Sequence, residues 1–182
     1  MKKWLIFLPI LLLAGCATQP DGMQEALDFR TALMAGETCT FQTEVTADLG
    51  DSVYQFAMDC DYADKTAHLT VTAPTEIAGI SATVQGDSAT LTFEDVAFTL
   101  PTEVGGNIPP MVLPKILGDA WVGGFIQWAT VESDGYTIQY ALEQPANLWV
   151  QTRFDETMTP TYVEIYEGGY LVLTASISDF SP

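Results

Sequence analysis

Apolar and polar residues alternate along most of the chain after Gly36, and this period of two predicts β-strands. Before it, five residues lie near helical spacing, so residues 23–35 are predicted to form a helix that ends at Gly36. They are Ala26, Leu27, Phe29, Arg30 and Leu33. The strand-like stretches are separated by short turns that contain Gly and Asp, which indicates antiparallel hairpins. We expect about nine or ten strands in meander order, in a sheet large enough to curl.

A sheet of this size needs a cover for its apolar face, and two segments can supply one. The first is the predicted N-terminal helix. The second is the segment 109–125, whose only charged residues are Lys115 and Asp119 and which is interrupted by proline. This composition predicts a short helix that is buried on most sides. The expected fold class is mainly β with a helical cover (α+β).

The first residues of the chain follow a different pattern. Lys2 and Lys3 precede an apolar run over residues 4–13, and Ala14, Gly15 and Cys16 follow it. A basic end, an apolar segment of about ten residues and small residues after it are typical of a secretory signal, and the segment is too short to span a bilayer. The chain is therefore predicted to leave the cytoplasm.

The sequence Leu-Ala-Gly-Cys that ends at Cys16 resembles the lipobox of bacterial lipoproteins. The resemblance implies a signal peptide over residues 1–15, cleavage before Cys16 and a diacylglyceryl group on its sulfur. Two acyl chains hold a protein stably on a membrane, whereas one chain binds reversibly. The expected location is the extracytoplasmic face of the cell membrane, or the outer membrane if the envelope has one. The alternative is an ordinary secreted protein in which Cys16 is incidental.

Residues 16–22 would form the tether and residues 23–182 a single domain. The six residues 17–22 that follow the lipidated cysteine reach at most ~20 Å. The domain is therefore expected to lie close to its membrane, with its binding site within reach of lipid. Removal of Lys2 and Lys3 leaves four basic residues against 24 acidic ones, a net charge of −20. This charge disfavours nucleic acid and anionic lipid headgroups as partners. The membrane anchor would therefore be acyl and not electrostatic.

The first hairpin runs from Cys39 to Tyr62 and turns near residues 48–51. A turn symmetric about Leu49 and Gly50 places Cys39 directly opposite Cys60, at a Cα distance that a disulfide accepts. With Cys16 lipidated in an exported protein, the two remaining cysteines form an even pair. The sequence therefore predicts a Cys39–Cys60 disulfide, and the alternative is two buried free thiols.

Two-residue turns and longer returns set the register of other hairpins. A two-residue turn at Gly86 and Asp87 places Val84 opposite Ala89. The return from strand 148–154 to strand 161–167 places Val150 opposite Ile165. Arg153 then lies diagonal to Glu164, where the two form a weak surface ion pair.

Two hairpins favour three-residue turns. A turn of this length at residues 133–135 places Trp128 opposite Tyr140, whereas a two-residue turn mixes the two faces. The turn at residues 167–169 is expected to have three residues for the same reason.

The order of elements resembles the lipoprotein-localisation superfamily, which includes LolA-like carriers, LolB-like acceptors and LppX-like lipid-binding lipoproteins. The similar features are a lipidated cysteine, an N-terminal helix, a long antiparallel meander and a proline-led helix in mid-chain. The most similar stretches are residues 73–84 and 109–121. The resemblance implies a half-open β-barrel around an apolar cavity that accepts acyl chains. It implies a membrane-anchored envelope lipoprotein that binds or transfers lipid and is not an enzyme.

The candidate cavity residues are large apolar or aromatic side chains on the predicted inner face or the mid-chain helix. Their sequence positions leave open whether they line a pocket or fill it as core. They are Phe41, Phe56, Phe93, Leu113, Ile116, Leu117, Trp121, Trp128 and Tyr140.

The sequence gives little support for a catalytic or metal-binding site. His68 is the single histidine and has no accompanying nucleophile motif, so no catalytic residue is predicted. The acidic stretch from Asp59 to Asp64 fails the calcium-loop pattern because Asp64 stands where that loop needs glycine. We expect no metal, no cofactor and a monomer.

Tyr162, Tyr166 and Tyr170 fall on the face opposite the predicted core. They suggest the alternative function, an envelope module with a filled core that docks a protein partner through this face. Ordinary cross-strand stacking on a solvated face explains the same pattern.

Overall fold

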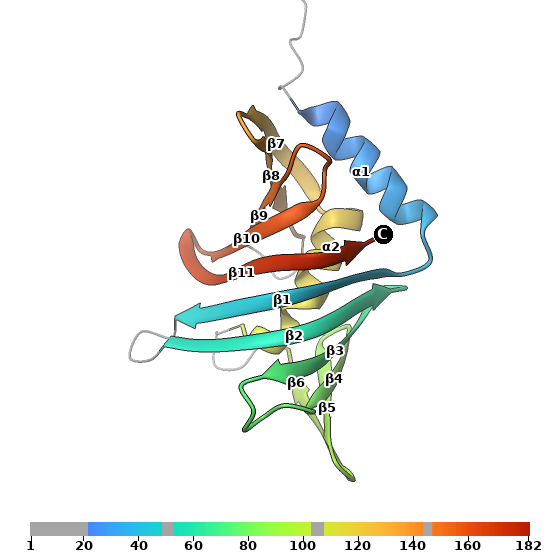
Figure 1. Ribbon diagram of the computed structural model, residues 1–182, viewed down its shortest axis with the longest axis vertical. Helices are drawn as coiled ribbons and strands as arrows, with labels where there is room; N and C mark the ends of the chain where they lie inside the picture. Colours follow the sequence, from blue (N-terminus) through green and yellow to red (C-terminus); the bar gives the residue numbers. More distant parts are fainter. Residues whose placement is uncertain (1–21, 49–52, 103–107, 144–146) are drawn as a thin grey trace, which may run out of the picture.

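Eleven antiparallel strands of the described residues form one curled sheet with two helices against it (Figure 1). The computed structural model describes residues 22–48, 53–102, 108–143 and 147–182. The predicted signal peptide, Cys16 and all of the tether except Gly22 lie outside these ranges. The helices are α1 (Met23–Ala35) and α2 (Leu113–Gly123), and the 3-10 turn η1 (Pro110–Val112) precedes α2.

The strands are β1 (Cys39–Asp48), β2 (Val53–Ala63), β3 (Thr66–Ala73), β4 (Ser81–Gln85), β5 (Ser88–Phe93), β6 (Val96–Pro101), β7 (Phe125–Glu132), β8 (Gly135–Ala141), β9 (Leu148–Phe154), β10 (Pro160–Glu167) and β11 (Tyr170–Ser181).

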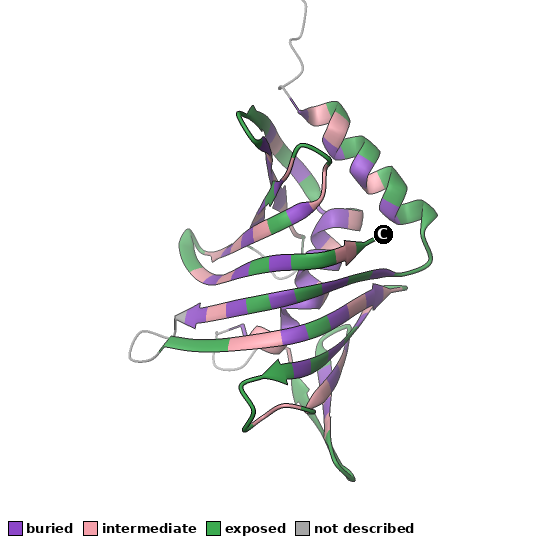
Figure 2. Ribbon diagram, in the orientation of Figure 1, coloured by how far each residue is buried: buried purple, intermediate pink, exposed green. Residues whose placement is uncertain are grey.

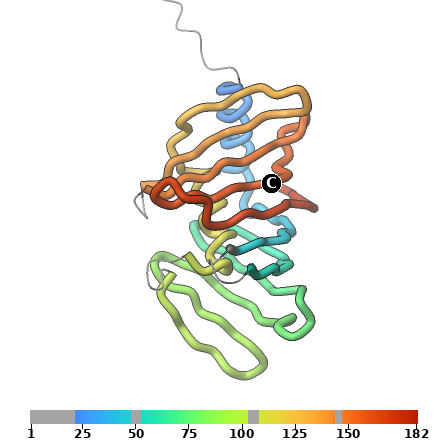
Figure 3. Tube along the Cα trace, turned by 90° about the vertical axis from the view of Figure 1, so that its left-hand side faces the viewer, coloured from blue at the N-terminus to red at the C-terminus, as the bar shows by residue number. Residues whose placement is uncertain are grey.

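The sheet is made of two meanders joined in its middle. Its strand order is β6-β5-β4-β3-β2-β1-β11-β10-β9-β8-β7, so the first strand of the domain pairs with the last. Figure 3 shows the two meanders one above the other. The predicted fold class is confirmed. The number of strands exceeds the expected nine or ten because even the short strands β4 and β6 pair into the sheet.

Both helices lie on the inner face of the sheet. α2 contacts β2, β3 and β8, and α1 contacts α2 and β7. Most strands alternate between buried and more exposed residues, whereas α2 is buried along most of its length (Figure 2). Within the described ranges, neither helix is long and apolar enough to cross a membrane.

The first helix has the predicted bounds, and its buried residues are Ala26, Phe29 and Leu33. At its end the backbone N–H of Gly36 donates to the carbonyl of Ala32 at 3.2 Å, and the chain turns into extended backbone. Helical spacing and the stop residue therefore predicted α1 correctly.

Two register predictions are confirmed. Val84 lies opposite Ala89 across the turn at Gly86 and Asp87. Val150 lies opposite Ile165, and a guanidinium nitrogen of the neighbouring Arg153 is 3.7 Å from the carboxylate of Glu164.

Both three-residue turns were predicted wrongly. Glu132 pairs with Gly135 and Glu167 with Tyr170, so each hairpin has a two-residue turn, and a bulge a few residues away restores the alternation of faces. The bulge in β7 lies at Gln127. As a result Trp128 lies opposite Gln139 and not opposite Tyr140.

The register of the first hairpin is shifted by two residues from the prediction. Cys39 lies opposite Tyr62, and Cys60 lies opposite Phe41. The faces are as predicted because a shift by two residues preserves them. The two cysteines are no longer directly opposite, and both are free buried thiols, so the predicted Cys39–Cys60 disulfide is not found.

Both thiols are expected to resist labelling in the folded protein. Burial raises the pKa of Cys39 and of Cys60 to about 12, so only roughly one part in ten thousand is thiolate at pH 8. Reaction with an aromatic disulfide reagent should be slow in buffer and fast in guanidinium chloride. Denatured protein that lacks these two thiols would instead indicate that they are bonded.

Candidate functional site

Helix α2 approaches the sheet most closely at Gly118. A Cβ atom there would lie 2.2 Å from the ring of Tyr62 in β2, so only glycine fits. The Tyr62 hydroxyl donates to the carboxylate of Asp119 at 2.8 Å, and Asp119 also pairs with Lys115 one turn earlier. Burial and this hydrogen bond raise the pKa of Tyr62. The contact fixes α2 over β2 and β3.

The space between α2, α1 and the middle of the sheet is filled by aromatic rings. Trp121 of α2 is fully buried, and its indole N–H donates to the hydroxyl of Thr152 at 3.0 Å. The rings of Phe29, Phe41 and Phe180 lie 5.6–6.0 Å from the ring of Trp121. Interlocked rings leave little space, so this half of the inner face is core.

The C-terminal end of α2 is held by Arg30 of α1. The guanidinium donates to the carbonyl of Trp121 at 3.0 Å and to that of Gly124. A cation at this position satisfies the free carbonyls of a helix end. It also lies 6.0 Å from the ring centre of Tyr140. Burial raises the pKa of Tyr140, whose hydroxyl has no hydrogen-bond partner among the described residues.

One row of cross-strand partners runs along the inner face from this core to the edge of the sheet. Its members on β1 to β6 are Phe41, Cys60, Leu69, Ala82, Leu91 and Phe98. The first five are buried, with at most 7% of each side chain exposed, but Phe98 is 48% exposed. The apolar inner face therefore continues past its cover and becomes open at β6.

Four large apolar residues form this uncovered part, which we call the open strip. Phe93 of β5 is paired with Val96 of β6, Phe98 is paired with the buried Leu91, and Leu100 with the buried Ala89. Paired residues lie on the same side of a sheet, so all four face inward. The exposed fractions of Phe93, Val96, Phe98 and Leu100 are 43%, 64%, 48% and 38%.

The structure places the predicted cavity residues in four different environments. Phe56 is half-buried and stacks on Tyr54, Phe93 belongs to the open strip, and Trp128 lies on the outer face. The remainder are buried in the core: Phe41, Leu113, Ile116, Leu117, Trp121 and Tyr140.

The prediction missed Val96, Phe98 and Leu100. Their signal was present in Val-Ala-Phe-Thr-Leu, where large apolar residues alternate with smaller ones and no residue is charged. An alternating strand pattern, however, does not show whether its apolar face is covered.

The outer face is polar around His68. A groove of about 350 Å³ is lined by Asp59, Asp61, His68 and neighbouring residues of β1 to β3. The imidazole Nδ1 of His68 lies 3.0 Å from the hydroxyl of Thr83. The described residues contain no group of three or more side chains suited to hold a metal ion.

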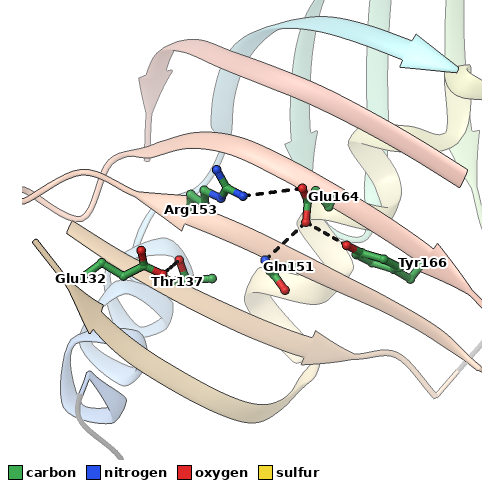
Figure 4. Close-up of polar contacts among 6 residues, drawn as sticks. All are labelled: Glu132, Thr137, Gln151, Arg153, Glu164 and Tyr166. Atoms are coloured by element: carbon green, nitrogen blue, oxygen red, sulfur yellow. Dashed lines mark hydrogen bonds and ion pairs between the residues drawn. The ribbon is translucent and has the colours of Figure 1, made fainter. Parts of the chain in front are cut away.

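Tyr162 and Tyr166 lie on the outer face as predicted and make contacts within their own sheet. Tyr170 pairs with Glu167, on the side of Ile165, and is exposed, so its predicted face was wrong. The Tyr166 hydroxyl donates to Glu164 at 3.0 Å, and the same carboxylate accepts from Gln151 at 3.3 Å and pairs with Arg153 (Figure 4). The ring of Tyr166 also stacks on Trp149 at 4.2 Å. These contacts match ordinary cross-strand stacking.

Comparison with known proteins gives a result for the fold only. No protein-family model matches the sequence, and no curated protein matches it. The crystal structure of a LolA superfamily protein from Nitrosomonas europaea matches with a TM-score of 0.50 and 10% identity, covering 87% of this chain and 92% of that one. The fold is LolA-like.

Two further structures have lower scores. A putative outer membrane lipoprotein-sorting protein domain from Vibrio parahaemolyticus matches with a TM-score of 0.48 and 10% identity, covering 86% of this chain and 90% of the other. LprF from Mycobacterium bovis matches with a TM-score of 0.45 and 14% identity, covering 90% and 96%. In this chain, the LolA-like sheet has its core under α2 and its open strip at β5 and β6.

Proposed function

We propose that this protein is a non-enzymatic envelope protein that binds acyl chains of lipids on the open strip of its LolA-like sheet. The observation that carries the proposal is the continuity of the inner face, which is buried as far as β5 and exposes large apolar side chains at β6. Clustered apolar residues on the surface of a protein mark sites for apolar partners.

The chemistry of the open strip favours an acyl chain over a lipid headgroup. Its four residues carry no charge or hydrogen-bonding side chain. The chain has a net charge of −18, which repels anionic headgroups. Apolar contact is therefore the main attraction that this surface offers, and its strength follows the apolar area removed from water.

Binding on the open strip does not require α2 to move. The packing of Gly118 on Tyr62 and the burial of Trp121 hold α2 in place over the core. A ligand at β5 and β6 meets side chains that are already exposed. A ligand would therefore dock at the uncovered end of the inner face without displacement of the mid-chain helix.

The site would face away from an anchoring membrane. The start of α1 lies at one end of the molecule, and β5 and β6 lie at the other (Figures 1 and 3). If Cys16 carries the anchor, its short tether would hold the first end near the bilayer. The ligand would then arrive from the aqueous side, which differs from the expectation of a site within reach of that bilayer.

A fluorescence titration tests the proposal. We expect 11-(dansylamino)undecanoic acid to gain emission saturably when the purified protein is added, and oleate to reverse the gain. Lipid extraction followed by mass spectrometry should also find acyl species in freshly purified protein. The absence of both a saturable signal and extractable lipid would refute the function.

A further inference from the structure

The two edges of the sheet differ in how they are protected. The β7 edge carries a bulge at Gln127, contains the charged Glu132 and is contacted by α1. Bulges, charges and covering helices are the usual ways in which proteins prevent an edge strand from pairing with another chain. By each of these measures β7 is a protected edge.

The β6 edge has none of these protections within the part of the chain that the structure describes. Its residues Val96–Pro101 are all exposed and include no charged residue. They pair with β5 in an unbroken register from Val96 to Pro101. Only the proline at the last position interrupts the edge. A regular, uncharged, largely apolar edge is a template for an added strand.

The turn before β6 determines which backbone groups are free. Glu94 and Asp95 form a two-residue turn, which makes Phe93 and Val96 the hydrogen-bonded pair next to it. The alternation of the ladder then directs the N–H and C=O groups of Ala97 and Thr99 away from β5. In agreement, the hydroxyls of Thr99 and Thr90 are 3.1 Å apart, as expected for a closely spaced pair that is not backbone hydrogen-bonded.

We propose that β6 accepts an extended segment of another protein, which joins the sheet as an additional antiparallel or parallel strand. Backbone hydrogen bonds to Ala97 and Thr99 would supply attraction that depends little on the partner's sequence. Side chains of the added strand on the inner side would lie beside Val96, Phe98 and Leu100, so alternate residues of the partner should be apolar.

The charge of the chain indicates which kind of segment the β6 edge attracts. Glu94 and Asp95 lie directly before β6, and the chain has a net charge of −18. A segment with basic residues at its ends is attracted to this edge, whereas a second copy of the chain is repelled. The inferred partner is therefore a basic, extended segment with alternating apolar residues, and not β6 of another copy.

A peptide probe tests the inference. The probe is a fluorescently labelled peptide of alternating valine and threonine with two lysines at each end. We expect it to bind the purified protein and to slow amide hydrogen exchange at Ala97 and Thr99. A matched peptide that is N-methylated on alternate residues, and so cannot pair along one edge, should bind at least tenfold more weakly.

The matched protein variants are Thr99→Pro and Thr99→Ala. Proline removes the outward N–H without removing a bond to β5, and edge strands tolerate proline. We expect at least tenfold weaker peptide binding by Thr99→Pro and at most a twofold change by Thr99→Ala. Both should keep fatty-acid binding, because Thr99 lies on the face opposite Phe98.

Three results would overturn the inference. The first is equal binding of the N-methylated and unmodified peptides. The second is the absence of any protection at Ala97 and Thr99 in the presence of saturating peptide. The third is a dimer of the protein alone that Thr99→Pro abolishes in analytical ultracentrifugation, since the edge would then serve a second copy.

Discussion

Replacing Gly118 with alanine is expected to lower the free energy of unfolding by about 3 kcal/mol, a large overpacking effect. The added Cβ would lie 2.2–2.4 Å from ring atoms of Tyr62, so either the ring or α2 must move. At an exposed helix position the same change would stabilise by about 1 kcal/mol, so the sign of the effect distinguishes the two situations. Chemical denaturation followed by tryptophan fluorescence measures it.

The control for this prediction is a double-mutant cycle with Tyr62→Ala. Removal of the ring leaves space for the new Cβ, so Gly118→Ala should be close to neutral or stabilising in that background. An equal loss of stability in both backgrounds would mean that α2 does not pack on Tyr62 in the way described.

Replacing Phe98 with serine is expected to weaken acyl-chain binding by about tenfold, because loss of roughly 1.4 kcal/mol of apolar contact corresponds to that factor. Phe98 is already about half exposed, so the unfolding free energy should change by about 1 kcal/mol or less. Titration with the dansyl fatty acid measures the first quantity, and thermal unfolding measures the second.

Leu171→Ser is the matched control for Phe98→Ser. Leu171 is 49% exposed, close to the 48% of Phe98, but it lies opposite Tyr166 on the other meander. Its replacement should leave fatty-acid binding unchanged. Equal weakening by the two variants would show that the dansyl probe reports general surface hydrophobicity and not the open strip.

Much of the fold follows from local pattern. The helix over residues 23–35 was predicted to the residue because its spacing and its terminal glycine agree. The inner and outer faces of the first hairpin were also correct, since alternation fixes them whatever the register. The predicted register of this hairpin was wrong, because a shift by two residues leaves the same faces and the composition of the turn allows both registers.

Bulges account for the errors in the later hairpins. A turn of three residues and a turn of two residues with a nearby bulge both restore the alternation of faces, and the sequence does not distinguish them. The choice mattered at Trp128, which the bulge at Gln127 places on the outer face. The pairing of β1 with β11 was not predicted for a different reason, since it is a long-range contact that no local pattern encodes.

The site was predicted less well than the fold. Whether Trp121 and Leu117 line a cavity or fill the core was left open by the sequence, and both are fully buried in the core that α2 packs against. Residues that fill a core and residues that line a pocket have the same composition. The sequence did not predict the open strip, because its exposure depends on how much of the inner face α2 covers.

The central claim is that an acyl chain lies on the uncovered end of the inner face, and photo-crosslinking tests it most directly. The purified protein would be irradiated with a fatty acid that carries a diazirine near its methyl end, and the modified residues would be mapped by peptide mass spectrometry. The account predicts modification within residues 93–100, reduced by excess oleate and by Phe98→Ser. Modification concentrated on Trp149 and Tyr166 of the outer face, or none that oleate reduces, would contradict it.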